Sequence, residues 1–92
     1  MPKLSESEIE QRLQGISWSR EGQAIVREWA FDDFAQALGF VNRVGEAAEA
    51  VNHHPDILLH GWNKVALTLS THSQGGLTQA DFDLARELEA LA

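Results

Sequence analysis

The chain contains no cysteine and only two prolines among its 92 residues. The absence of cysteine excludes a disulfide framework, a thiolate nucleophile and a Cys-ligated zinc site. No apolar run approaches the roughly 20 residues of a membrane-spanning helix, and the polar stretch MPKLSESEIEQRLQG lacks the apolar core of a signal peptide. We therefore expect a cytoplasmic protein with no membrane partner.

Basic residues are half as frequent as acidic ones, with seven Lys and Arg against fourteen Asp and Glu and a net charge of -7. Such a charge repels the phosphate backbone, whose neutralisation supplies most nucleic-acid affinity, so we expect no direct binding to nucleic acid. Hydrophobic residues make up 43% of the chain, as in a folded globular protein. The length fits one domain over residues 1–92. So short a chain buries only about 60 to 65% of its unfolded surface, which favours further burial between subunits.

Three segments carry helix signals. Apolar residues recur at steps of three and four from Phe34 to Val51, behind the N-capping pair Asp32-Asp33, and predict a helix of about 18 residues. This helix must end near His53, because His54 precedes a proline and such a residue is pushed out of the α region. The helices expected over residues 6–14 and after residue 78 each open with a hydrophobic staple and a capping box, formed by Leu4, Ser5, Glu8 and Ile9 and by Leu77, Thr78, Asp81 and Phe82.

Alternating apolar residues predict four strands. The stretch WSREGQAIVREWAF reads as two strands that meet near residues 21–22, although Arg27 breaks the alternation. ILLHGW and KVALTLSTH read as two more, with Thr71 and His72 closing the last strand. The order α-β-β-α-β-β-α predicts a single α+β domain, with three helices packed on one face of a four-stranded antiparallel sheet.

Three of the four histidines fall where the predicted topology brings the chain together. His53 and His54 end the long helix, and the hairpin that follows returns His72 to the same level. Three imidazoles could therefore line one cleft. Glu49 lies four residues before His53, so the two side chains share a face if the helix persists that far. His60 is expected to be an exposed turn residue.

Simpler interpretations of these histidines exist. A histidine near a helix C-terminus often only caps the last carbonyl groups. Three histidines could instead bind zinc and leave one position open for water, but the adjacent His53 and His54 side chains diverge and suit this poorly. No GxSxG elbow supports a serine nucleophile. General acid and base chemistry near neutral pH is favoured, with no metal.

The segment EAVNHHPDILLHGWNKVALTLSTHSQGGLTQADFDLA resembles the signature region of the pterin-4a-carbinolamine dehydratases. The resemblance extends upstream to Trp18 and to the motif REWAF, so it covers most of the chain. It implies an α+β fold assembled as a homodimer or homotetramer. It also implies dehydration of 4a-hydroxytetrahydropterin to quinonoid dihydropterin, which recycles the pterin cofactor of aromatic amino acid hydroxylases, with no cofactor or metal of the enzyme's own.

The same resemblance assigns roles to individual residues. It implies that His53, His54 and His72 are the catalytic and substrate-contacting histidines. Our hypothesis within that set is that His53 and His72 carry the acid and base roles while His54 positions the pterin. The supporting residues that it implies are Glu49 and Asp81. The residues that it implies beside the bound pterin are Pro55, Thr71 and Ser73.

The sequence departs from the family pattern at one wall of the expected pocket. Many members have an aromatic residue where this chain has Ile57, and the segment from Pro55 to Trp62 is one residue longer than in some relatives. Non-catalytic alternatives also remain at this point. Relatives of this fold include assembly or scaffold factors, and a pterin-binding accessory protein of molybdenum cofactor metabolism would keep the same pocket.

Overall fold

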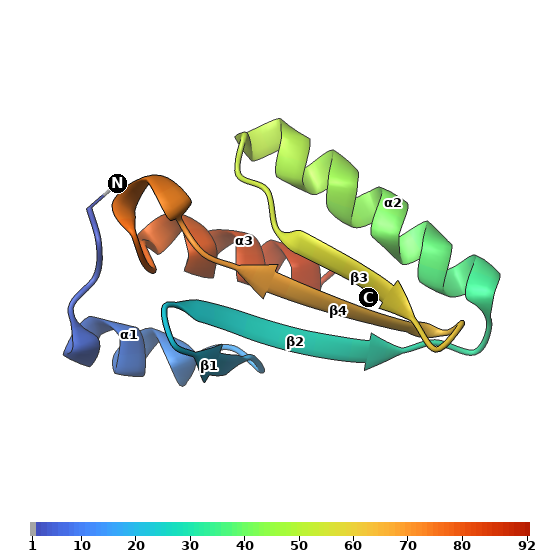
Figure 1. The fold of residues 1–92 in the computed structure, drawn as a ribbon, viewed down its shortest axis with the longest axis horizontal. Helices are drawn as coiled ribbons and strands as arrows, with labels where there is room; N and C mark the ends of the chain where they lie inside the picture. The colour runs from blue at the N-terminus through green and yellow to red at the C-terminus, as the bar shows by residue number, and fades with distance from the viewer. Residues whose placement is uncertain (1) are drawn as a thin grey trace.

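The computed structural model describes residues 2–92. Within this range the elements follow the predicted order, and the predicted α+β fold is confirmed (Figure 1). No helix in residues 2–92 combines the length and the hydropathy needed to cross a membrane. The elements are α1 (Glu6–Leu13), β1 (Ser19–Glu21), β2 (Ala24–Ala30), α2 (Phe34–Val51), β3 (Asp56–His60), β4 (Lys64–Leu69), the 3-10 turn η1 (His72–Gln74) and α3 (Gln79–Glu89).

The helices begin where their capping residues predict. At α1, the Glu8 amide donates to Ser5 Oγ at 3.3 Å, and the Ser5 amide donates to Glu8 Oε1 at 2.8 Å. At α2, the Gln36 amide donates to Asp33 Oδ1 at 2.8 Å. These bonds satisfy amide groups that have no partner inside the helix, so local sequence fixes the helix starts before any packing is considered.

The four strands form one antiparallel sheet in the order β1-β2-β4-β3. The pairings of Ile25 with Leu69 and of Trp29 with Val65 align apolar side chains of β2 and β4 on one face. Helices α2 and α3 lie on this side of the sheet, and Ile9 of α1 joins the same core (Figure 1). The sheet therefore has one covered face, as predicted.

Aromatic residues form the centre of the core. The ring of Phe40 in α2 is fully buried and lies 5.0 Å from the Trp29 ring and 5.1 Å from the Phe31 ring, measured between centroids. Arg27 lies on the same face of β2, where its side chain is partly exposed and its charge is paired. Its guanidinium lies 4.6 Å from the Trp29 ring centroid and pairs with Glu89 of α3, which explains how the alternation can be broken there.

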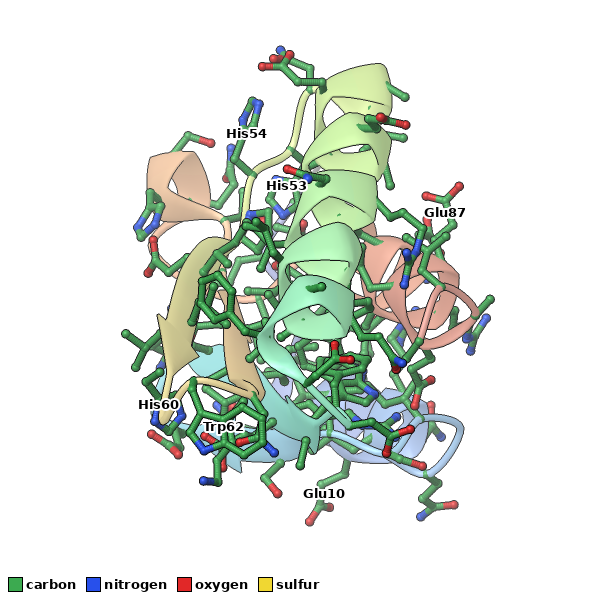
Figure 2. All side chains as sticks on the ribbon, turned by 90° about the vertical axis from the view of Figure 1, so that its right-hand side faces the viewer. Glu10, His53, His54, His60, Trp62 and Glu87 are labelled. Carbon is green, nitrogen blue, oxygen red and sulfur yellow. The ribbon has the colours of Figure 1, made fainter. Side chains whose placement is uncertain are left out.

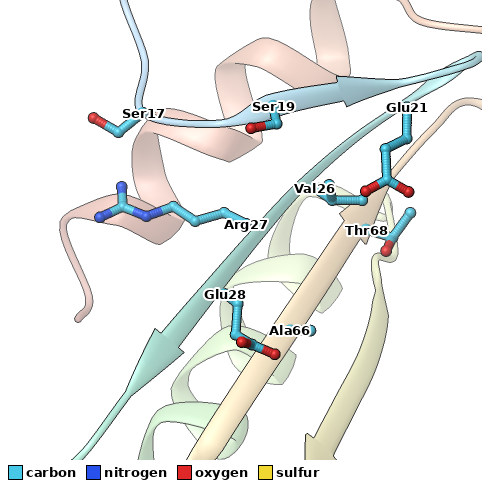
Figure 3. A pocket seen from close by; sticks show the side chains of 8 residues that line it. All are labelled: Ser17, Ser19, Glu21, Val26, Arg27, Glu28, Ala66 and Thr68. Atoms are coloured by element: carbon cyan, nitrogen blue, oxygen red, sulfur yellow. The ribbon is translucent and has the colours of Figure 1, made fainter.

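The opposite face of the sheet carries no helix within the described residues (Figure 3). A hollow of about 580 Å³ lies over it, and its lining includes Val26, Glu28, Ala66 and Thr68. None of the residues that sequence analysis assigned to the site lines this hollow. The candidate site therefore lies elsewhere.

The last strand is shorter than predicted. β4 ends at Leu69, whereas Thr71 and His72 were expected to close it. The Ser70 hydroxyl donates to the Gln23 carbonyl at 2.7 Å, and Thr71 then forms an isolated bridge with Gly76. The chain has therefore turned into a small loop before His72, which changes the surroundings of that histidine.

Candidate active site

The end of α2 separates the two adjacent histidines. Asn52 adopts a left-handed conformation with φ 51°. The His53 amide donates to the Ala48 carbonyl at 3.1 Å, and the Asn52 amide donates to the Glu49 carbonyl at 3.2 Å. This pair of bonds is a Schellman motif, which ends a helix and redirects the chain. His53 and His54 consequently point in different directions (Figure 2).

The expectation that Glu49 shares a helix face with His53 is wrong. The helix ends at Val51, two residues too early for the spacing of four to apply. Glu49 Oε1 instead lies 3.5 Å from Nε2 of His54, and both side chains are exposed. An exposed pair of this kind contributes little to stability, since solvent screens it. Glu49 therefore lies beside the exposed His54 and not beside His53.

The inner histidine pairs with a buried carboxylate. His53 Nε2 lies 2.6 Å from Asp81 Oδ1, and the Asp81 side chain is 0% exposed while that of His53 is 17% exposed. The other carboxylate oxygen, Oδ2, accepts bonds from the Thr71 hydroxyl at 2.8 Å and from the Thr78 amide at 2.9 Å. Asp81 also lies in the first turn of α3, where the helix dipole stabilises a negative charge. Both hydrogen bonds to Oδ2 thus come from donors.

His72 lies on a small loop beside this network. It begins η1 directly after Thr71, and both His72 and Ser73 are exposed. The bridge from Thr71 to Gly76 closes the loop, with N to O distances of 3.0 and 3.3 Å. A Cβ at position 76 would lie 2.7 Å from Lys3 Cε and 2.8 Å from Gln23 Oε1, so a larger residue where the loop closes would require these two side chains to shift. The pairing of Thr71 with Gly76 therefore fixes both ends of the loop that contains His72.

The predicted residues come together only in part. His53, Thr71 and Asp81 form one hydrogen-bonded network, and the half-buried Pro55 follows His54 at the same end of the fold. Within residues 2–92, no hydrogen bond or ion pair joins one histidine to another. A cleft of about 230 Å³ is lined by His53 together with Val51, Ala80, Asp83, Leu84 and Glu87.

The zinc alternative has no ligand set in the described part of the chain. No group of three or more His, Cys, Asp or Glu side chains there lies close enough to hold a metal ion. His60 also differs from expectation. It ends β3, and its ring contacts Glu28 of β2 on the uncovered sheet face. His60 lies away from His53 (Figure 2).

Sequence reasoning missed one member of the network. The side chain of Thr78 is fully buried, and its hydroxyl lies 2.9 Å from the Thr71 hydroxyl. The residue was predicted only as the N-cap of α3, which it is. A signal existed in the sequence, since Thr78 and Asp81 form the capping box and Asp81 was assigned to the site.

The sequence model of the pterin 4 alpha carbinolamine dehydratase family matches residues 2–91. The protein belongs to this family. A relative from Thermomicrobium roseum, whose name includes pterin-4-alpha-carbinolamine dehydratase, is 47% identical and the alignment covers 100% of this chain and 99% of the relative. A similarly named relative from Nocardia farcinica is 48% identical over 97% of this chain and 94% of its own length.

Two solved structures are similar to the structure of this chain. A transcriptional coactivator/pterin dehydratase from Brucella melitensis has a TM-score of 0.91 and 36% identity, with 98% of each chain covered. A pterin dehydratase-like protein identified as a RuBisCO assembly factor in the alpha-carboxysome has a TM-score of 0.70 and 28% identity, with 83% of this chain and 89% of that one covered. Proteins similar to this chain in fold thus carry names of three kinds: pterin dehydratase, transcriptional coactivator and RuBisCO assembly factor.

Asn52 is expected to control the stability of the helix end that leads into His53. Asn52→Val places a β-branched residue in the left-handed region and should lower the free energy of unfolding by about 1 to 2 kcal/mol. Asn52→Gly adopts that conformation without strain and should lower it by less. Urea unfolding monitored by tryptophan fluorescence measures both values. Equal losses in the two variants would contradict the role given to the left-handed conformation.

Proposed function

We propose that this protein dehydrates a 4a-hydroxytetrahydropterin to the quinonoid dihydropterin by histidine general acid and base catalysis. Family membership over residues 2–91 supports the reaction class. The observation that carries the proposal is the contact of His53 with the buried Asp81. A buried carboxylate whose other oxygen is held by two donors can orient an imidazole for proton transfer, as the third member of a catalytic triad does.

The proposed reaction needs two proton movements and no change of oxidation state. The C4a–O bond breaks as a general acid delivers a proton to the hydroxyl group, which leaves as water. A general base removes the proton from N5, and the electron pair of the broken N5–H bond forms the C4a–N5 double bond. Histidine suits both steps, because its imidazole gains and loses a proton near neutral pH.

The roles proposed for individual residues come from the family resemblance, and the positions of the side chains support some of them. His53 and His72 are proposed as the acid and base pair, and the exposed His54 is proposed to position the pterin. Glu49 accompanies His54, and Asp81 orients His53. Pro55 and Ser73 are proposed to border the bound pterin, because each adjoins one of these histidines in the chain. No step requires a cofactor or a metal.

The direct test is a stopped-flow assay with freshly generated 4a-hydroxytetrahydropterin, in which formation of the quinonoid product is followed. The substrate also dehydrates unaided, so the measured quantity is the excess rate over a sample without protein. We expect this excess to increase linearly with protein concentration. No excess at micromolar protein would refute the enzymatic proposal.

A non-catalytic assembly role is the second candidate. The similarity to the RuBisCO assembly factor, at 28% identity, supports it. A scaffold does not require an oriented histidine, so the contact of His53 with Asp81 favours the enzyme. A protein that binds a reduced pterin analogue in calorimetry but gives no excess dehydration would favour the non-catalytic role.

We infer that the protein forms a homodimer or homotetramer and that it functions in the cytoplasm. Several large apolar side chains remain exposed in the described part of the chain, and two of them lie on the edge strand β3. An edge strand with exposed apolar residues readily pairs with another chain. The exposed residues are Phe34, Leu38, Val51, Ile57, Leu58 and Trp62.

Light scattering after size exclusion is expected to give a mass at least twice the 10.2 kDa of one chain. Leu58→Lys should lower this mass, because Leu58 is 58% exposed on β3 and a lysine opposes pairing at a sheet edge. Gln11→Lys adds the same charge on the exposed side of α1 and should leave the mass unchanged. A monomeric wild-type protein would contradict the inference.

A further inference from the structure

Two threonine hydroxyls connect to the carboxylate that holds His53. Thr71 follows β4, and Thr78 is the N-cap of α3. Their Oγ atoms lie 2.9 Å apart, and Thr71 Oγ lies 2.8 Å from Asp81 Oδ2. The Thr78 side chain is fully buried and Asp81 is 0% exposed, while Thr71 is half-buried, so solvent competes little for the hydrogen bonds at the Thr78 and Asp81 end of this network.

Each hydroxyl has only one hydrogen, and this fixes the direction of every bond. An ionised carboxylate only accepts, so the Thr71 hydrogen goes to Asp81. Thr71 Oγ must then accept the hydrogen of Thr78. Thr78 Oγ in turn accepts from the Ala80 amide at 3.3 Å. Donation therefore runs in one direction, from Ala80 through Thr78 and Thr71 to Asp81.

The donors around Asp81 also determine which ring nitrogen of His53 holds its proton. Asp81 Oδ2 receives two hydrogens, one from the Thr71 hydroxyl and one from the Thr78 amide. These donors and the N-terminal end of α3 stabilise the ionised form of the carboxylate. Its Oδ1 therefore accepts the Nε2–H of His53 at 2.6 Å. In the neutral imidazole this leaves Nδ1 without a proton.

We propose that Thr71 and Thr78 are positioning residues that hold Asp81 so that His53 keeps its proton on Nε2 and exchanges a proton with the substrate through Nδ1. This inference rests on the proposed dehydratase function. It also changes the role expected for Thr71, since its only hydrogen is committed to Asp81 and cannot be donated to a pterin. Thr71 acts on the reaction through Asp81 and His53.

The test compares Thr71→Val, which removes the hydroxyl and keeps the shape, with Thr71→Ser, which keeps the hydroxyl. Long-range ¹H–¹⁵N spectra of ¹⁵N-histidine-labelled protein, without substrate and at a pH where imidazole is neutral, report the tautomer of His53. The His53→Gln spectrum identifies its signal. We expect Nε2–H in the wild type, and a ratio of Nε2–H to Nδ1–H that falls about tenfold in Thr71→Val, the equivalent of one hydrogen bond to a charged group.

Kinetics provide the second measurement. Thr71→Val should lower kcat about tenfold with KM changed by less than about twofold, because a positioning residue does not touch the substrate. Thr71→Ser should restore both kcat and the tautomer ratio. A selective rise in KM would instead indicate direct substrate contact and overturn the assignment.

Failure of this inference can be distinguished from failure of the proposed function. A tautomer ratio unchanged in Thr71→Val overturns the inference whatever the activity. If the tautomer ratio changes as expected in Thr71→Val but the wild-type protein shows no dehydration, the positioning of His53 is supported and the dehydratase function is refuted. If Thr71→Val does not fold, the wild-type spectrum still decides, because a proton on Nδ1 of His53 overturns the inference.

Discussion

Replacing His53 or His72 by alanine is expected to lower the turnover of 4a-hydroxytetrahydropterin about 10²-fold or more, the usual loss when a general acid or base is removed. His53 contacts the buried Asp81 carboxylate, and His72 lies on the loop that Thr71 and Gly76 close. Both variants are measured in the stopped-flow assay, after subtraction of the spontaneous rate.

Two further variants keep this result interpretable. His53→Ala leaves the buried Asp81 carboxylate without one of its partners, so His53→Gln, whose amide can still donate to Asp81, separates loss of proton transfer from loss of folding. His60→Ala removes a histidine that contacts Glu28 on the uncovered sheet face and should leave turnover unchanged. Wild-type turnover in both His53→Ala and His72→Ala would disprove the assignment.

Phe40→Ala is expected to cause the largest loss of stability, about 3 to 5 kcal/mol, because it removes a fully buried ring and leaves a cavity among the remaining aromatic residues. Small proteins have only about 5 to 15 kcal/mol of unfolding free energy, so this single change should bring the chain close to unfolding. Urea unfolding at fixed protein concentration measures the loss.

The same helix offers a matched control. Phe34 begins α2 and is 50% exposed, so Phe34→Ala deletes the same ring with much less burial and should cost far less. Equal losses in the two variants would show that the core is not centred on Phe40. Because Phe34 is one of the residues proposed for subunit contact, the comparison is made at two protein concentrations.

The fold was predictable because its signals are local. The capping bonds of Ser5, Asp33 and Thr78 join residues two or three positions apart, and they fix where the helices begin. Alternation of apolar residues similarly fixes which face of β4 is buried. Neither depends on knowing how distant segments meet.

The candidate site was predictable only as a group of residues. The motif placed His53, Asp81 and Thr71 together, but the partner of Glu49 depended on one backbone angle at Asn52, which periodicity does not encode. The hydroxyl of Thr78 contacts Thr71 across the loop that carries His72. Such a contact depends on the three-dimensional closure of the loop, so the capping box connected Thr78 with Asp81 in the sequence but gave no sign of the contact with Thr71.

The two capping boxes differ in how freely they can change. At the start of α1, the Ser5 and Glu8 bonds are exposed and serve only the helix, so protein engineering can exchange them for other capping pairs. At the start of α3, the carboxylate of Asp81 both begins the helix and holds His53. In a mutational library, selection for folding and selection for activity would act on the same atoms there. Stabilising substitutions are therefore to be sought at the first helix start and avoided at the last.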